Sequence, residues 1–377
     1  MKFYYYICNY TYLKKNNVIY KKGMTEEKQI QKVMNKIMDN LELEEHCEKN
    51  NIPLKMPYTI EDIENCKDIE HDKVCKDFIN LCKFEADTNP KKFCGNKILY
   101  NYQFRNLLKC KREKGKTLYE IFDDEELKEK LWRDSVKRNK KDNNPYPSPT
   151  DVYEANRINS GAIVFFKAST AKYIYKKFNA KSVLDFTMGW GGRMLGAQSL
   201  DINYIGIDTN ENLKEGYEKM IKDIGFTKKP LLIWYNCLNI DYSQLDYDLI
   251  LTSPPYINME LYENMTPFEN DNKYYNEFLI PMMDKTFKYL KDGGRMCINI
   301  SPKMYKDLTT KYGYRECDET EDLRQQMGKN FVVKSQDYVY IWKKDDKDDI
   351  KEIIEKMECL EKGEWIKELN DVLDKYV

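Results

Sequence analysis

Short apolar runs alternate with helical stretches over the second half of this chain, and this pattern constrains the fold more than any other feature. Each run has the length of a strand and is followed by polar residues, whereas segments between the runs, such as 275–290, show helical spacing. The runs lie at residues 182–185, 204–208, 231–235, 247–252, 295–300 and 338–342. Apolar strands separated by helices predict an α/β fold with a parallel sheet covered on both faces.

The rest of the chain predicts helices around this α/β part. Thr25 precedes two glutamates, which favours a helix start, and apolar residues then recur at helical spacing up to Leu41. A further helix is expected over 124–136, whereas polar residues and repeated prolines at 137–149 argue against one there. The sequence divides into a mainly helical region at 1–142, a linker at 143–156, the α/β domain at 157–343 and C-terminal amphipathic helices at 344–377.

The charges of the chain nearly cancel. Its 62 Lys and Arg residues are matched by 63 Asp and Glu residues, so the formal net charge is -1 at pH 7. A globally basic surface, typical of proteins that coat nucleic acid, is therefore excluded. We expect any contact with nucleic acid to come from local patches, such as the basic residues within 137–141.

The cysteines and histidines do not predict a metal site. The 11 cysteines include no C-x-x-C pair, and only two histidines, His46 and His71, are present. Structural zinc sites need closely spaced ligand pairs, so we expect reduced thiols and no metal.

No segment has the pattern of a targeting or membrane-spanning sequence. Residues 3–8 are apolar but too short and too aromatic for a signal peptide, and are expected to form a strand. No apolar run approaches the roughly 20 residues that cross a bilayer. We expect a soluble, intracellular, cytoplasmic protein.

A glycine-rich turn follows the first apolar run. It begins at Asp185, contains Gly189 and Gly191, and leads into a helix. Glycines allow backbone conformations closed to other residues and let a ligand approach the main chain. In doubly wound sheets this turn faces the crevice where ligands bind, so we expect a cofactor to lie against it.

Polar residues follow the next two runs at the same edge. Asp208 comes about twenty residues after Gly189, the spacing at which an acid meets ribose hydroxyls in this architecture. An Asp that only caps the next helix fits the same position. Asn236 and Cys237 follow the third run, where a side-chain amide is expected to bind an adenine ring. These features suit any ribose-containing cofactor and do not separate a dinucleotide from S-adenosyl-L-methionine (SAM).

The tetrapeptide Ser253-Pro254-Pro255-Tyr256 follows the fourth run and is expected inside the same crevice. Two prolines fix φ and remove two N–H donors, which predicts a rigid turn with outward carbonyls. A carbonyl and the Ser253 hydroxyl can accept hydrogen bonds from an amino group and direct its lone pair at an electrophile. Tyr256 offers a flat face on which a base removed from its stack can rest.

Taken together, these motifs resemble the amino-methyltransferases that modify N4 of cytosine or N6 of adenine. That family has the pattern Asp-Pro-Phe-x-Gly-x-Gly, then an acid, then (Ser/Asp/Asn)-Pro-Pro-(Tyr/Phe/Trp). Asp185, Gly189 and Gly191 match the first motif, with Phe186 and Thr187 replacing its Pro and Phe, and residues 253–256 match the last motif fully. The resemblance covers about residues 157–343 and implies a Rossmann-like SAM-dependent methyltransferase sheet.

The resemblance also implies roles and partners. Segment 165–170 is similar to the one that contacts the methionine end of SAM, with Ala168 where a Pro is usual. Thr-Ser-Pro-Pro-Tyr at 252–256 is the form of the last motif most associated with N4-cytosine enzymes. The cofactor-binding residues expected are Lys167, Ser169, Thr170, Asp185, Phe186, Gly189, Gly191, Asp208, Asn236 and Cys237. The partner expected is DNA, read by residues 1–150 or by the loop 257–275. Trp-Gly-Gly-Arg at 190–193 is similar to phage and large-virus members, which would place the protein in host-cell cytoplasm.

Other reactions fit these residues less well. Carbon-5 methylation of cytosine needs a nucleophilic thiolate, and the chain has no Pro-Cys dipeptide. A dehydrogenase has no use for Pro254-Pro255, and metal catalysis lacks histidines. Adenine N6 in DNA, RNA, a protein side-chain amide, and a catalytically inactive methyltransferase fold kept as a DNA-binding or interaction subunit stay open as alternatives.

Overall fold

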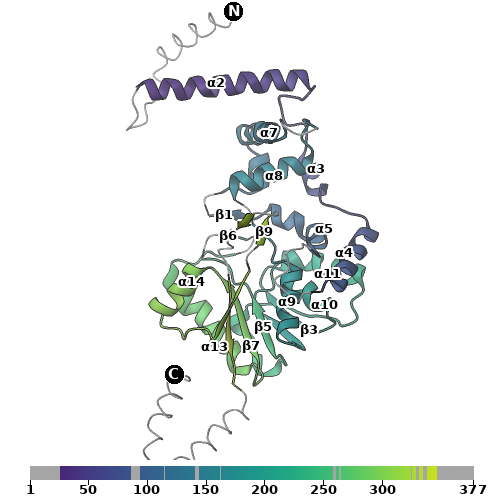
Figure 1. The fold of residues 1–377 in the computed structure, drawn as a ribbon, viewed down its shortest axis with the longest axis vertical. Coiled ribbons are helices and arrows are strands. Elements are labelled where there is room, and N and C mark those ends of the chain that lie inside the picture. Colours follow the sequence, from purple (N-terminus) through teal and green to yellow (C-terminus); the bar gives the residue numbers. More distant parts are fainter. Residues whose placement is uncertain are drawn as a thin grey trace, which may run out of the picture. The chain divides into compact units, whose positions relative to one another are not determined.

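The computed structural model describes residues 26–85, 94–113, 115–140, 144–161, 163–257, 260–262, 265–323, 325–327, 331–333 and 338–345 (Figure 1). The longer helices are α2 (Glu26–Lys49), α3 (Ile60–Asn65), α4 (His71–Lys83), α5 (Asn96–Leu108), α6 (Leu118–Phe122), α7 (Glu125–Asn139), α8 (Pro149–Ser160), α9 (Ala168–Lys177), α10 (Gly192–Gln198), α11 (Lys214–Ile224), α13 (Ile280–Tyr289) and α14 (Pro302–Lys306). The strand predicted at 3–8 and nearly all of the helices predicted at 344–377 lie outside the described residues.

A seven-stranded mixed sheet forms the centre of the α/β part. Its strands are β2 (Ser182–Asp185), β3 (Asn203–Asp208), β4 (Leu231–Trp234), β5 (Leu249–Thr252), β7 (Arg295–Ile300), β8 (Glu319–Asp322) and β11 (Tyr338–Lys343). They are ordered β4-β3-β2-β5-β7-β11-β8. The first five are parallel, and β11 runs antiparallel to both β7 and β8.

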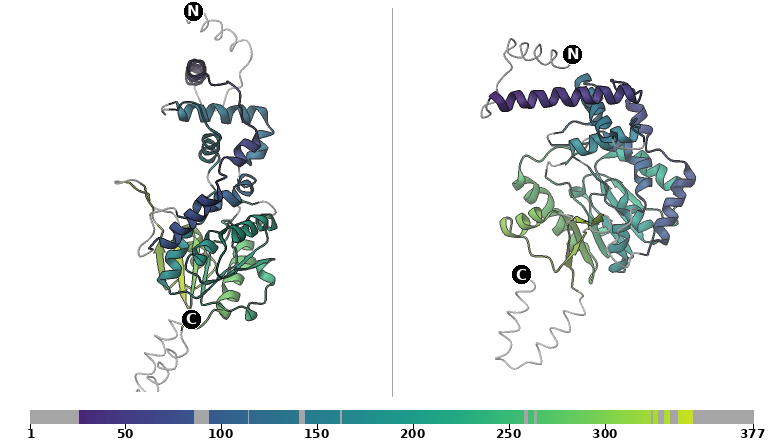
Figure 2. Two further views of the ribbon diagram at one scale, coloured as in Figure 1. Left: turned by 90° about the vertical axis from the view of Figure 1, so that its right-hand side faces the viewer. Right: turned by 45° about the horizontal axis from the view of Figure 1, so that its top comes forward.

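Helices cover both faces of this sheet (Figure 2). On one face, Met283 of α13 and Met304 of α14 belong to the same buried cluster as Leu184 of β2 and Ile250 of β5. On the other face α10 packs closely on α9. A Cβ on Gly196 would lie only 2.7 Å from the Cβ of Ala171, so the lack of a side chain at Gly196 allows this contact. Burial on both faces explains why three of the four residues of β5 are apolar and why Val183 and Leu184 form the centre of β2.

The predicted fold class is confirmed: the protein has a Rossmann-like α/β sheet with helices on both faces. All six predicted strands are present, and a helix covers most of 275–290 as a π-helical segment (Tyr274–Leu279) followed by α13. The expected parallel sheet is present in its first five strands, and β11 runs antiparallel to β7, since the period of a strand does not encode its direction. The edge strand β8 of this sheet was not predicted. Two separate strand pairs were not predicted either: β1 (Lys111–Arg112) with β6 (Glu260–Leu261), and β9 (Gln325–Met327) with β10 (Phe331–Val333).

The chain forms two compact units whose boundaries differ from the predicted division. The described residues up to Pro57 form one unit with Glu125–Ala155, and Tyr58–Asp124 form the other with the described residues from Asn156 onward. In the first unit, Trp132 is buried and its Nε1 donates to the carbonyl of Pro53 over 2.6 Å. The helical N-terminal part predicted at 1–142 is thus divided between two units.

Helices α4 and α5 are built into the unit that carries the sheet. Lys172 of α9 is only 4% exposed, and its Nζ donates to the carbonyls of Leu81 and Cys82 over 2.8 Å each. Gln103 of α5 is fully buried, and its Nε2 donates to the carbonyl of Leu213 over 3.1 Å. These polar groups find partners only when both segments are present.

The linker predicted at 143–156 is wrong from residue 149 onward. Helix α7 continues to Asn139, and α8 begins at Pro149 and runs through the rest of the predicted linker. Pro149 stands at the first helical position, where a missing N–H costs nothing. The Ser148 hydroxyl accepts from the Asp151 N–H over 3.3 Å, and Asp151 accepts from the Ser148 N–H over 2.8 Å, a capping box that starts the helix.

Candidate active site

The residues predicted for the site meet at the carboxyl edge of the parallel strands. The glycine-rich turn follows β2, Asp208 ends β3, Asn236 follows β4, and the tetrapeptide follows β5. These strands lie side by side in the sheet, so residues far apart in the sequence share one edge. This edge is where open α/β sheets bind their ligands.

Asp208 holds the glycine-rich turn. Its Oδ2 accepts from the Gly189 N–H over 2.8 Å, and its Oδ1 accepts from the Asn210 N–H over 2.9 Å. Burial raises the pKa of Asp208 above its ordinary value. Each carboxylate oxygen has a second lone pair, so these bonds leave acceptor capacity for a ligand hydroxyl. The predicted contact with a ribose stays a prediction. The alternative role as a helix cap is taken by Asn210, whose side chain accepts from the Asn212 N–H.

The glycines of the turn leave room for a ligand. Gly189 has φ 53° and Gly191 has φ 93°, both in the left-handed region that favours glycine. A Cβ on Gly189 would have the carbonyl oxygen of Thr187, at 3.9 Å, as its nearest neighbour, so the space beside Gly189 is open. The Tyr217 hydroxyl donates to the carbonyl of Gly189 over 2.9 Å and thereby ties the turn to α11.

Gly192 joins this turn to the segment predicted to contact the methionine end of SAM. A Cβ on Gly192 would lie 1.9 Å from the carbonyl oxygen of Phe166, so no other residue fits without moving one of the two segments. Lys167 follows Phe166 as the N-cap residue of α9, and burial lowers the pKa of Lys167 to about 8. Gly192 was not among the predicted site residues, although its place beside Gly191 is a readable signal.

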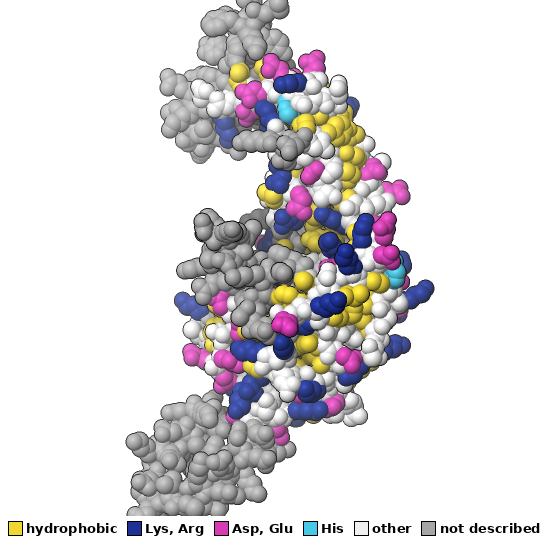
Figure 3. Space-filling model, turned by 45° about the vertical axis from the view of Figure 1, so that its right-hand side comes forward, with side chains coloured by type: hydrophobic (Ala, Val, Ile, Leu, Met, Phe, Trp, Pro, Cys, Tyr) yellow, Lys and Arg dark blue, Asp and Glu magenta, His cyan; other side chains and the backbone are white. Residues whose placement is uncertain are grey.

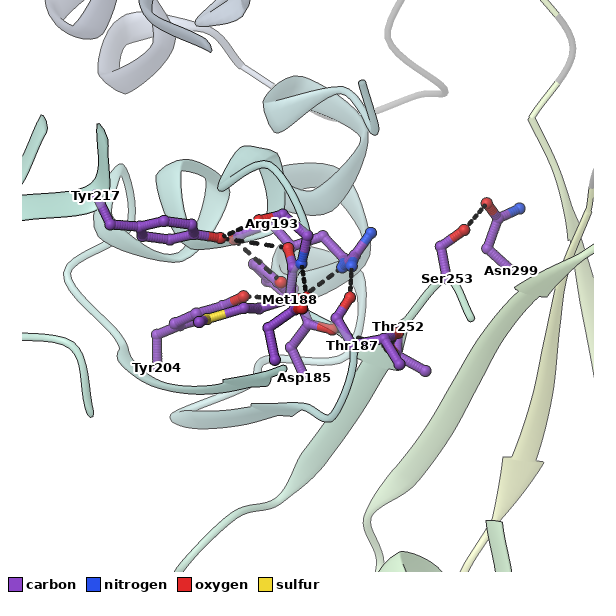
Figure 4. A network of polar contacts seen from close by, with 12 residues as sticks. Asp185, Thr187, Met188, Arg193, Tyr204, Tyr217, Thr252, Ser253 and Asn299 are labelled. Atoms are coloured by element: carbon purple, nitrogen blue, oxygen red, sulfur yellow. Dashed lines mark hydrogen bonds and ion pairs between the residues drawn. The ribbon is translucent and has the colours of Figure 1, made fainter. Parts of the chain in front are cut away.

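Asp185 does not reach the surface of the site, and this corrects its predicted role as a cofactor ligand. Its carboxylate is fully buried and accepts from Arg193 Nε over 2.6 Å, from the Tyr204 hydroxyl over 2.6 Å and from the Thr252 hydroxyl over 2.8 Å (Figure 4). Arg193 also donates to the carbonyl of Thr187. Asp185 therefore shapes the turn from inside the protein. Arg193 and Thr252 were missed, because nothing local marks them as partners of Asp185.

Other predicted cofactor residues are also turned inward. Phe186 is 1% exposed and Cys237 7% exposed, both within one hydrophobic cluster. Burial raises the pKa of the Cys237 thiol to about 12, so it stays protonated. Ser169 and Thr170 are buried in the first turn of α9. A direct contact of these side chains with a cofactor is therefore not supported, and their effect on the site is through packing.

Asn236 keeps an exposed side chain at the end of β4. Its Oδ1 accepts from the Leu238 N–H over 2.9 Å, which caps a short helical turn. The amide nitrogen is not used in that bond. The predicted role of Asn236 toward an adenine ring stays a prediction.

The tetrapeptide follows β5 directly and has no regular secondary structure. Pro254 is buried, whereas Ser253, Pro255 and Tyr256 are partly exposed. The Ser253 hydroxyl lies 3.2 Å from Oδ1 of Asn299 on β7 (Figure 4). The Thr252 hydroxyl, just before the tetrapeptide, donates to Asp185, so the end of β5 belongs to the buried network beneath the glycine-rich turn.

The loop after the tetrapeptide approaches the glycine-rich turn and the N-terminal part of the same unit. The rings of Trp190 and Tyr262 lie 5.8 Å apart, and Trp190 lies 5.4 Å from Phe165. Strand β6 in this loop pairs with β1. Strand β1, a part of the region 1–150 predicted to read the target, therefore pairs with the loop 257–275, the other region predicted to do so.

Two further findings concern metal sites and membrane spans. In the described ranges no group of three or more His, Cys, Asp or Glu side chains is arranged to hold a metal ion. Among the helices that the structure describes, none combines the length and the apolar character needed to cross a membrane.

No protein-family model and no curated protein matches this chain. Similar solved structures include TehB from Haemophilus influenzae, with 17% identity and a TM-score of 0.33 over 51% of this chain and 66% of TehB. An rRNA methylase from Streptococcus thermophilus has 15% identity and a TM-score of 0.33 over 49% of this chain and 99% of its own. A SAM-dependent O-methyltransferase from Thermotoga maritima has 14% identity and a TM-score of 0.33 over 50% of this chain and 70% of its own.

Proposed function

We propose that this protein transfers a methyl group from SAM to the exocyclic amino group of a base in DNA. The base that we propose is cytosine, methylated at N4. One observation carries the proposal: Ser253-Pro254-Pro255-Tyr256 follows β5, next to β2, whose glycine-rich turn is held by Asp208. A rigid acceptor turn beside a cofactor turn is what methyl transfer to an amino group requires.

The residues of the turn fit SAM. The open space at Gly189 admits a ligand against the main chain, and Asp208 retains acceptor capacity for ribose hydroxyls. Lys167, beside the turn, offers a cation to the carboxylate of the methionine end. When bound, SAM supplies a methyl group whose carbon–sulfur bond breaks, with its electron pair going to sulfur, as the amino nitrogen bonds to the carbon.

The tetrapeptide would orient the amino group. The Ser253 hydroxyl and the Pro254 carbonyl accept its two hydrogens, which leaves the nitrogen lone pair directed at the methyl carbon. As positive charge develops on the nitrogen, both acceptors stabilise it, and one proton then leaves to solvent. Tyr256 stacks on the flipped base. No residue of the chain forms a covalent bond to the base.

DNA binding at this site would depend on local contacts. The net charge is -1, and on the face shown in Figure 3 Lys and Arg side chains lie among Asp and Glu side chains. An enzyme that binds its substrate transiently needs no uniformly basic surface. We expect the affinity for non-specific DNA to be low and to fall further as salt is raised.

The experiment that tests the proposal is mass spectrometry of nucleosides from DNA of a methylation-deficient bacterial host that expresses the chain. A Ser253→Ala variant serves as the matched control. N4-methylcytosine that appears only with the unaltered chain supports the proposal, and N6-methyladenine keeps the mechanism and changes the base. A modified base in RNA alone moves the substrate to RNA. SAM binding without any methylated nucleoside supports a protein substrate or an inactive fold and contradicts the proposal.

A further inference from the structure

Asn299 lies directly beside the tetrapeptide. It stands on β7, which pairs in parallel with β5, and Thr252 is registered opposite Ile298. The next residues along the two strands are Ser253 and Asn299, whose side chains meet. Asn299 is 5% exposed, so its amide is a buried polar group that needs partners.

The orientation of the Asn299 amide follows from its second partner. Nδ2 of Asn299 lies 3.1 Å from the main-chain carbonyl oxygen of Tyr338 on β11. A carbonyl oxygen can only accept, so the NH₂ group must face Tyr338 and the Oδ1 atom must face Ser253. An amide oxygen is itself only an acceptor. The Ser253 hydroxyl is therefore the donor in the bond of 3.2 Å to Asn299.

This bond decides what the Ser253 hydroxyl can offer a ligand. With its hydrogen directed at Asn299, the oxygen presents only lone pairs to the site. A freely rotating hydroxyl could instead donate its hydrogen to the lone pair of an incoming amino nitrogen, and that lone pair is the nucleophile. We propose that Asn299 is a positioning residue that keeps Ser253 an acceptor of the amino hydrogens of the target base. The inference rests on the proposed function.

A purely structural role for Asn299 would make a different prediction. Its bond to Tyr338 adds a tie between β7 and β11, but these strands already pair over the six residues of β11. If Asn299 only joined the strands, loss of the bond to Tyr338 would matter and loss of the bond to Ser253 would not. Two variants separate these bonds. Asn299→Leu removes both bonds. Asn299→Asp keeps an oxygen acceptor toward Ser253 but loses the NH₂ group that donates to Tyr338.

The experiment is a double-mutant cycle on the full chain, with methyl transfer from SAM to unmethylated plasmid DNA as the assay. Asn299→Leu should lower kcat about tenfold, the size of one neutral hydrogen bond, with little change in KM for SAM. The same change in a Ser253→Ala background should have no further effect, because no hydroxyl is left to orient. Asn299→Asp should retain most of kcat. Tyr247→Phe, which loses a buried hydroxyl-to-carbonyl bond of 2.7 Å away from the tetrapeptide, is the matched control and should keep full kcat.

Each outcome decides the inference. An equal fall in kcat in the presence and absence of the Ser253 hydroxyl would overturn it, as would an Asn299→Asp variant as impaired as Asn299→Leu. If Asn299→Leu does not fold, judged by its thermal transition, the kcat of Asn299→Asp is compared with that of Ser253→Ala. The inference is supported if Asn299→Asp retains most of kcat and is overturned if its kcat is as low as that of Ser253→Ala. A wild-type chain that transfers no methyl group to DNA overturns the proposed function, and the inference with it. An active wild type with additive variants overturns only the inference.

Discussion

Arg193 and Asp185 form a buried ion pair beneath the glycine-rich turn, with Nε and Oδ2 2.6 Å apart and side chains 5% and 0% exposed. Asp185 also accepts from Tyr204, whose pKa burial raises well above its ordinary value, so that its hydroxyl stays protonated and donates. Arg193 also donates to the carbonyl of Thr187, and Asp185 also accepts from Thr252, so both charges are compensated inside the protein. The turn that is proposed to hold the cofactor is therefore supported by a network in which the loss of either charge is strongly destabilising.

Removal of one charge from this pair should destabilise the protein. Asp185→Asn leaves the guanidinium of Arg193 buried without a counter-charge, and we expect the free energy of unfolding to fall by about 3–5 kcal/mol. Urea denaturation followed by circular dichroism measures the change. Glu215→Gln, which breaks an exposed pair with Lys219, is the control and should leave stability nearly unchanged. A loss as small as in this control would show that Asp185 is not essential to the turn.

The tetrapeptide should act on catalysis and not on cofactor binding. Ser253→Ala removes an acceptor that the proposed transition state uses, so kcat should fall about a hundredfold. Tyr256→Ala removes the stacking surface and should lower kcat and raise KM for DNA. Isothermal titration with SAM should give nearly the wild-type Kd for both variants. Equal losses of kcat and SAM affinity would contradict the roles assigned to both residues.

A methyl group on Gly192 should disrupt the cofactor side of the site. Gly192→Ala places a Cβ 1.9 Å from the carbonyl oxygen of Phe166, so the turn and the start of α9 must separate. We expect a lower melting temperature and weakened SAM binding. Gly225→Ala is the control: its φ is 69° but its Cβ would meet no atom within 4 Å, so it should cost about 1–2 kcal/mol of strain and leave SAM binding intact.

SAM affinity should depend on pH through Lys167. Burial lowers the pKa of Lys167 to about 8, so its positive charge is present below that pH and is lost above it. If Lys167 meets the carboxylate of the methionine end, the Kd for SAM should rise as pH passes through about 8. Lys167→Met should bind SAM weakly at low pH and lose that part of the pH dependence. Identical pH profiles for both proteins would exclude the contact, since titration of SAM itself is common to both.

The α/β part should not fold without α4 and α5. A chain reduced to residues 157–377 leaves Lys172 without the carbonyls of Leu81 and Cys82 and uncovers the face that α5 occupies through Gln103. We expect this fragment to lack the cooperative thermal transition of the full chain, as measured by near-ultraviolet circular dichroism. In the full chain, Lys172→Met should keep the transition at an altered midpoint. A cooperative fragment would support the predicted boundary near residue 157.

The sequence by itself determined the positions of the six main strands and the edge at which the site lies. Buried parallel strands need apolar side chains on both faces, so they appear as apolar runs, and the turns after them carry Gly189, Asp208 and Ser253. Only the tertiary structure decided which of the neighbouring side chains face the site. Asp185, Phe186 and Cys237 have the same local signals as site residues but are turned inward.

The direction of β11, the place of α4 and α5, and the contact of Asn299 with Ser253 also came from the tertiary structure alone. The partners involved are far apart in the chain: 67 positions separate Asp185 from Thr252, and 46 separate Ser253 from Asn299. Side-chain periodicity reports only which face of an element is apolar. Which polar group meets which partner depends on how the strands are ordered in the sheet, and that order is set by packing over the whole unit.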